Sequence, residues 1–131
     1  MGEAGGRGGI VPDGAGGQGG IVSDGAAAFV ALDMRVGRVL RAEPHAQARK
    51  PAYKIWIDFG PLGEKTSSAQ LADLYSAEAL VGQLLVCAVN LGTKRIAGFP
   101  SEVLVLGLPD AEGRVVLLQP EREVPVGGRV Y

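Results

Sequence analysis

The feature that most constrains the fold is a succession of short apolar segments, each the length of a strand and most bounded by glycine or proline. Residues 53–59 (YKIWIDF) show the pattern best, because Tyr53, Ile55, Ile57 and Phe59 alternate with polar or larger outward-facing side chains. Further strands are predicted at 36–42, 65–69, 84–89, 94–97, 103–106 and 115–119. Many short strands at close spacing predict an all-β fold, a small closed or nearly closed barrel.

One good helix is predicted within residues 70–81, between the third and fourth strands. Ser76 can cap a helix that begins at Ala77, Glu78 favours its first turn, and Gly82 provides a stop. A short helical turn near Phe29 is also expected to lead into the first strand. The five-stranded OB-fold barrel has this order of elements, while periodicity alone also permits another small barrel.

The first 28 residues differ from everything that follows. Residues 5–14 (GGRGGIVPDG) and 16–25 (GGQGGIVSDG) form a nearly identical tandem repeat. Glycine this dense carries a high ordering entropy and offers few side chains to bury, so we interpret residues 1–28 as a flexible tail. A phosphate-binding glycine loop would need a strand before it and a helix after it, and neither is predicted there. Residues 29–131 are then expected to form one β-rich domain.

Composition narrows the class of protein. A chain of 131 residues allows one domain, and its longest apolar runs have strand length, so we expect no membrane insertion. The first residues do not form a secretory signal, and a single cysteine cannot form an internal disulfide. We therefore expect a cytoplasmic protein.

Charge is near balance overall but unevenly placed. The net charge of −1 argues against a protein that coats nucleic acid by charge alone. Basic residues gather in the first part of the predicted domain: Arg35, Arg38, Arg41, Arg49, Lys50 and Lys54. Acidic residues are in excess after Ser101, namely Glu102, Asp110, Glu112, Glu121 and Glu123. Such a chain can present a basic face.

Catalysis, cofactors and metals are not expected. His45 is the only histidine and Cys87 the only cysteine, and the two cannot make a zinc site with the usual spacing. Cys87 lies among apolar residues, where a thiol behaves as a small apolar side chain. No Ser–His–acid arrangement and no carboxylate pair for acid–base chemistry stands out. We predict that the protein is not an enzyme.

Several stretches carry a resemblance to a known family. They are 33–37 (DMRVG), 48–60 (ARKPAYKIWIDFG), 67–70 (SSAQ) and 88–107 (AVNLGTKRIAGFPSEVLVLG). With them, residues 29–131 resemble the tRNA-binding-domain family, and most of all its free-standing bacterial members that act as secretion chaperones. The resemblance implies an OB-fold, a homodimer, tRNA binding and, for the chaperone members, a role toward proteins awaiting export. Val103 and Leu104 stand where other family members have Gly-Met, which favours the chaperone branch.

The candidate RNA-binding residues come from two sources. Basic side chains that can contact phosphates are Arg38, Arg49, Lys50 and Lys54. Positions that match the family's N-L-x-x-x-K/R-x-x-G-x-x-S-E segment or its SSAQ stretch are Asn90, Lys94, Arg95, Ser101, Glu102 and Ser68. Each has a structural alternative: a solvated charged face for the cations, a loop tie for Asn90, and a backbone bond for Ser68. Trp56 can stack on a base, but packing or an interface is favoured.

Two functions follow as hypotheses. The first is an RNA-binding module whose partner is tRNA or another structured RNA, which its cations would hold by the phosphates. The second is a chaperone that binds unfolded or precursor polypeptides, together with export machinery, through apolar grooves.

Overall fold

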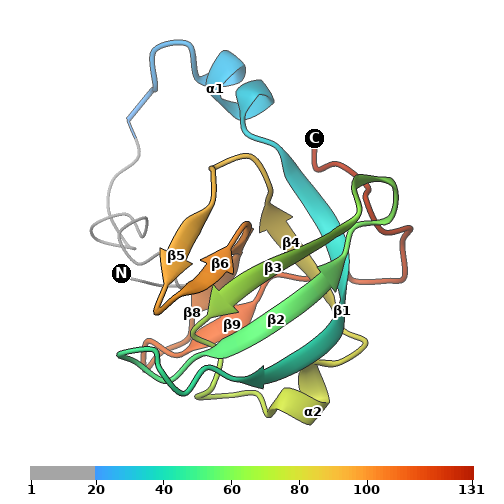
Figure 1. The fold of residues 1–131 in the computed structure, drawn as a ribbon. Helices are drawn as coiled ribbons and strands as arrows, with labels where there is room; N and C mark the ends of the chain where they lie inside the picture. Colours follow the sequence, from blue (N-terminus) through green and yellow to red (C-terminus); the bar gives the residue numbers. More distant parts are fainter. Residues whose placement is uncertain (1–19) are drawn as a thin grey trace.

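The computed structural model describes residues 20–131, so residues 1–19 of the tail predicted over 1–28 lie outside the described residues. The first helix, α1, spans Gly25–Ala31 and therefore begins before the helical turn expected near Phe29. It buries none of its side chains and stands away from the barrel at the top of Figure 1. The predicted boundary between residues 28 and 29 falls inside this helix.

The centre of the molecule is a five-stranded antiparallel sheet with the order β3-β2-β1-β4-β7. Its strands are β1 (Met34–Pro44), β2 (Tyr53–Asp58), β3 (Glu64–Ala69), β4 (Leu84–Ala88) and β7 (Leu104–Val105). The sheet curls until β3 approaches the segment before β7, where the Thr66 carbonyl accepts from the backbone N–H of Glu102 at 2.8 Å. The result is a nearly closed barrel, which confirms the predicted all-β, OB-type fold (Figure 1).

β1 belongs to both halves of this barrel. Its first half pairs with β4, its second half pairs with β2, and Arg38 is in register with both Asp58 and Leu84. β1 can change partners here because Gly37 has no side chain and lies directly against the core. A Cβ atom at this position would stand 2.5 Å from Cγ2 of Ile57. The core inside consists of apolar side chains such as Ile57, Phe59 and Leu85, all with no exposed surface.

The remaining elements are short: η3 (Gly60–Leu62), α2 (Ala77–Leu80), β5 (Lys94–Ile96), β6 (Phe99–Ser101), β8 (Gly107–Pro109) and β9 (Val115–Leu117). β5 and β6 form a hairpin, and β8 and β9 form another. The β5–β6 hairpin lies beside β3 in Figure 1, and its strand β6 contacts β3. The segment after β9 runs back along β1, where the Val36 carbonyl accepts from the N–H of Gly127 at 2.7 Å.

The helix predicted within residues 70–81 is present in the part that follows Ser76. Only Ala77–Leu80 is helical, and the Ser76 hydroxyl caps it as expected by accepting from the N–H of Ala79 at 3.1 Å. Residues 70–75 form a turn instead, because Leu71 is buried in the barrel core and the Tyr53 hydroxyl donates to the Tyr75 carbonyl at 2.8 Å. Tertiary contacts here override local helix preference.

Two strands occupy segments that were predicted as turns. β6 contains Pro100 and β8 ends at Pro109, and each residue looked like a strand breaker. Both strands belong to separate two-stranded ladders, where a missing N–H is tolerated at an edge. The Pro100 carbonyl still accepts a hydrogen bond, from the Thr66 hydroxyl at 2.7 Å.

Candidate nucleic-acid interface

Ser101 and Glu102 close the barrel. The N–H of Ser68 donates to the Ser101 hydroxyl at 3.0 Å, and the N–H of Thr66 donates to Oε1 of Glu102 at 2.9 Å. Both donors belong to β3, an edge strand whose outward N–H groups would otherwise lack partners. The two side chains thus replace a missing strand ladder. Their polar atoms are engaged in the fold, although the sequence placed them among the RNA-binding residues.

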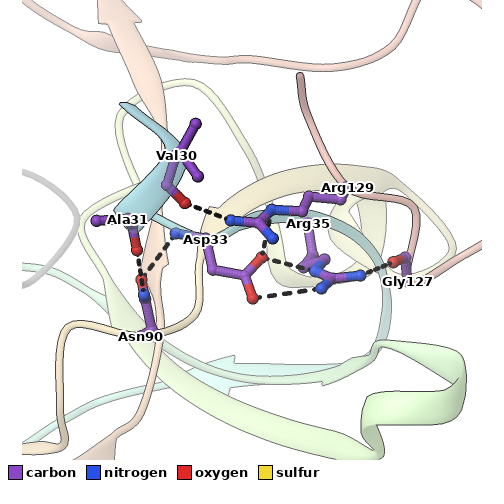
Figure 2. Close-up of polar contacts among 7 residues, drawn as sticks. All are labelled: Val30, Ala31, Asp33, Arg35, Asn90, Gly127 and Arg129. Carbon is purple, nitrogen blue, oxygen red and sulfur yellow. Dashed lines mark hydrogen bonds and ion pairs between the residues drawn. The ribbon is translucent and has the colours of Figure 1, made fainter. Parts of the chain in front are cut away.

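Asn90 joins α1 to the barrel rather than standing beside Lys94 as a free amide. Its Oδ1 accepts from the N–H of Asp33 at 2.9 Å and its Nδ2 donates to the Ala31 carbonyl at 2.8 Å (Figure 2). Asn90 therefore has the structural role that was the alternative to RNA binding, because both ends of its amide are bonded to backbone. The partner is the connection between α1 and β1, not the loop that carries Asn90.

An ionic cluster continues this junction. Asp33 accepts from Arg35 at 2.6 Å, and this bond holds the pKa of the Asp33 carboxyl below its usual value. Arg35 also donates to the Gly127 carbonyl at 3.0 Å, and Arg129 donates to the Val30 carbonyl at 2.6 Å (Figure 2). The cluster therefore ties both ends of the described chain to the start of β1.

Arg38 lies away from the other predicted cations. It is in register with Asp58 at one end of β2, whereas Lys54 is in register with Ser68 near the other end. Its guanidinium forms an ion pair with Glu123 and donates to the Gly82 carbonyl at 2.8 Å. The basic face predicted from Arg38 together with residues 49–54 is therefore not a single surface.

Ion pairing divides the described cations into two groups. Those with a carboxylate partner are Arg35, Arg38, Arg41, Lys54, Arg114, Arg122 and Arg129. Within residues 20–131, those without one are Arg49, Lys50, Lys65, Lys94 and Arg95. Arg95 donates only to the Gly98 carbonyl, at 2.7 Å. Most of the unpaired cations belong to the 45–52 connection and to β5, so positive charge is uncompensated there.

These segments enclose a hollow, which we call the basic hollow. It has a volume of about 650 Å³ and is lined by Ala48, Arg49, Lys50, Ala52, Ser68, Gln70, Ile96 and Ala97. Its walls are the connection between β1 and β2, the end of β3, and the turn of the β5–β6 hairpin, which point to the lower left in Figure 1. OB-folds bind oligonucleotides at this place, between the loop joining their first two strands and the loop joining their last two.

The basic hollow brings together only part of the predicted site. Arg49, Lys50 and Ser68 line it, and Lys94 and Arg95 lie on the strand that leads to its Ile96 wall. Lys54 is the cross-strand neighbour of Ser68 but is ion paired with Glu43 at 3.5 Å. Arg41 is also paired with Glu43 and holds the pKa of that carboxyl below its ordinary value.

Aromatic side chains flank the basic hollow. Phe99 of β6 packs edge-on against Trp56, with ring centroids 5.5 Å apart, and against His45, at 5.7 Å. The guanidinium of Arg41 lies 4.3 Å from the centre of the Trp56 ring. The packing role favoured for Trp56 is thus present, and its half-buried ring still has some exposed surface.

His45 is a site residue that sequence reasoning missed. Only 4% of it is exposed, and its Nδ1 shares a hydrogen bond of 2.9 Å with the Ser68 hydroxyl. Burial lowers the pKa of its imidazole, and the nearby Lys54 ammonium lowers it further. A single histidine between Pro44 and Ala46 has no periodic neighbours, so no local pattern could reveal its burial.

Cys87 matches its prediction, since it is buried in the core and burial raises the pKa of its thiol. Among residues 20–131 no group of histidine, cysteine and carboxylate side chains could hold a metal ion. Nor does this part of the chain contain a helix long and apolar enough to cross a membrane.

Comparison with known proteins identifies relatives of this fold. The family model described as "Putative tRNA binding domain" matches residues 34–129. The chain is 33% identical over 102 residues to methionine–tRNA ligase of Methanosarcina acetivorans, which covers 78% of this chain but only 14% of that ligase. The chain therefore matches only a small part of the ligase.

Solved structures agree. The chaperone CsaA from Bacillus anthracis str. Ames is 46% identical, with a TM-score of 0.75, over 86% of this chain and 100% of CsaA. A MetRS-related protein from Pyrococcus horikoshii is 32% identical, with a TM-score of 0.75, over 86% of this chain and 100% of that protein. The barrel, its side-chain closure and these matches lead to one conclusion: the chain belongs to the tRNA-binding-domain family.

Proposed function

We propose that this protein is a non-catalytic RNA-binding module whose ligand is tRNA or another structured RNA. The observation that carries the proposal is the group of cations without carboxylate partners around the basic hollow, at the place where OB-folds bind oligonucleotides. Membership of the tRNA-binding-domain family supports the same ligand. Because tRNA acts in the cytoplasm, a cytoplasmic location is part of the same proposal.

The unpaired cations matter because a phosphate can bind them without first breaking an ion pair. Arg49, Lys50 and Lys94 are exposed and have no ion pair to break within the described chain, so a phosphate can bind them directly. Arg38 would first have to leave Glu123. Phosphate contacts supply affinity without sequence information, and each releases counterions from the nucleic acid.

The test is the salt dependence of tRNA binding. We expect Lys94→Ala combined with Arg95→Ala to weaken binding and to reduce the slope of log K against log salt by about 1 for each cation that contacts a phosphate. The control is Arg114→Ala combined with Arg122→Ala, which removes two arginines that are ion paired elsewhere. Fluorescence anisotropy at several salt concentrations measures both. A tRNA affinity that is insensitive to salt would contradict the proposal.

A second function is the binding of unfolded or precursor polypeptides, in concert with export machinery. The observation that favours it is the 46% identity to a protein named as the chaperone CsaA, over nearly all of the described chain. The half-buried rings of Trp56 and Phe99, together with the apolar walls of the basic hollow, would serve as the grip. Suppression of client aggregation that persists at high salt, and that tRNA competes away, would support a site shared by both ligands. Absence of suppression at stoichiometric protein would exclude this function.

We also propose that the protein is a homodimer that uses α1. This helix buries none of its residues, and its apolar side chains Phe29 and Val30 are 46% and 66% exposed. Hydrogen bonds from Asn90 and Arg129 nevertheless hold the helix in place. An apolar helix fixed in position and left uncovered fits a second copy of the chain. Two barrels joined in this way would present two basic hollows to one folded RNA.

A further inference from the structure

The basic hollow has a chemical composition that selects its ligand. It contains two cationic side chains, Arg49 and Lys50, and no carboxylate. Apart from the polar residues Ser68 and Gln70, its remaining walls are small or aliphatic side chains, Ala48, Ala52, Ile96 and Ala97. A volume of about 650 Å³ lies within the range of pockets that enclose a small molecule. The lining therefore suits a group with an anionic part and a flat, weakly polar part.

Gln70 is the side chain that can read such a group. It is half-buried at the end of β3, lines the basic hollow, and its carboxamide has no hydrogen-bond partner within residues 20–131. The Ser68 hydroxyl, which also lines the hollow, is already committed to His45. A carboxamide both donates and accepts, so it can pair with the edge of a nucleobase.

The wall of the hollow that the hairpin turn forms is held in place. His45 is buried between Ser68 and the ring of Phe99, and Ala97 of the hairpin turn adopts a left-handed backbone with φ of 47°. Arg95 fixes the same turn by donating to the Gly98 carbonyl at 2.7 Å. A ligand would therefore meet a pocket that is already formed, which lowers the entropic cost of binding.

An extended peptide fits the basic hollow less well. Peptides often bind by adding a strand to a free sheet edge, but the N–H groups of Thr66 and Ser68 on β3 are taken by Glu102 and Ser101. The apolar walls are mostly alanine, which offers little area to anchor a large apolar side chain.

We propose that the basic hollow takes one unstacked nucleotide of the bound RNA, with its phosphate on Arg49 and Lys50 and its base edge on Gln70. This inference rests on the proposed RNA-binding function and adds to it a base preference. Cations alone would bind every sequence equally, whereas an amide that meets a base edge discriminates among bases.

The experiment measures the affinity of the full chain for labelled single-stranded oligo(A), oligo(C) and oligo(U), and for tRNA. We expect the native protein to prefer one homo-oligomer, and Gln70→Ala to lower that affinity by about tenfold while leaving the salt slope unchanged. Arg49→Ala with Lys50→Ala should weaken binding of all the oligomers and reduce the slope. Gln47→Ala is the matched control, since Gln47 is an exposed amide in the same connection that does not line the hollow.

Gln70→Glu provides a second variant that keeps the shape of the side chain but loses both amide donors, and it should change which oligomer binds best. Equal binding of all oligomers by the native protein, or an equal effect of Gln70→Ala on each, would overturn the nucleotide pocket and leave RNA binding intact. Failure to bind both tRNA and the oligomers would refute the function itself. If the Gln70 variants lose polypeptide binding while their base preference stays that of the native protein, the hollow would be assigned to a peptide instead.

Discussion

Individual polar side chains differ in whether they hydrogen bond within the fold, and this separates the structural residues from the candidates for ligand binding. The side chains of Ser101 and Glu102 accept hydrogen bonds from N–H groups on β3 and so stabilise the barrel. Gln70 and Lys50, by contrast, have no partners within residues 20–131. Both kinds of residue sit in similar motifs of the sequence. Only the bonds made across the fold separate them, because a buried donor must be paired and an exposed one need not be.

The pH dependence of stability should report His45. Burial and Lys54 hold its folded pKa below the ordinary value of about 6.5, so the unfolded chain binds a proton that the folded chain does not. Stability should therefore be complete above about pH 7 and fall as the pH drops through about 6.5 toward the lowered folded pKa. Urea denaturation followed between about pH 7.5 and 5 measures this slope.

His45→Gln is the control, because His45 is the only histidine in the chain. The variant should lose most of the slope in that window. The lowered pKa values of Asp33 and Glu43 act at more acidic pH, where loss of their charge removes ion pairs. A native protein that becomes more stable as the pH falls from 7 to about 5 would contradict the assignment.

Among the elements, β1 decides how the barrel is built. It pairs with β4 through its first half and with β2 through its second, and the change of partner occurs at Gly37 and Arg38. Strands with a strong alternating pattern, such as β2, were predicted closely from the sequence. The short strands β6 and β8 were missed because proline masked them, whereas the helix capped by Ser76 lies over Ala77–Leu80, where the sequence placed it.

Gly37→Ala should destabilise the protein by about 1–3 kcal/mol, since the new Cβ would meet Ile57 Cγ2 at 2.5 Å and Phe59 Cε1 at 2.7 Å. Chemical denaturation gives the free energy of unfolding. The matched control is Gly128→Ala, where the Cβ would come no nearer than 3.4 Å to the Pro125 carbonyl oxygen and should change stability much less. Equal stability of the two variants would show that β1 has room to move at this position.

For the whole molecule, the arrangement of charge matters more than its sum. The net charge of −1 conceals a basic hollow on one side and ion-paired arginines elsewhere, for example Arg114 with Asp110 and Arg122 with Glu121. Pairing neutralises the field of a cation toward a distant anion, so these arginines would contribute little to the proposed RNA binding.

The oligomeric state tests the role of α1. Phe29→Ser combined with Val30→Ser should shift the protein from dimer to monomer in sedimentation analysis, because each side chain buried in the interface would contribute about 1.5–3 kcal/mol. Leu62→Ser is the control, since Leu62 is 40% exposed on η3 and not on α1. A native protein that sediments as a monomer, or a variant that stays dimeric, would exclude this interface.

The sequence by itself determined the strand pattern, the fold class, the family and the presence of cations near residues 49–54 and 94–95, because these depend on local alternation and on motifs. The tertiary structure alone decided which polar groups were left for a ligand. Thr66 meets Glu102, Asp33 meets Asn90, and Arg38 meets Glu123 across long stretches of chain. Hydrogen-bond partners so distant in sequence leave no local pattern, so the roles of Ser101, Asn90 and His45 could be read only from the folded barrel.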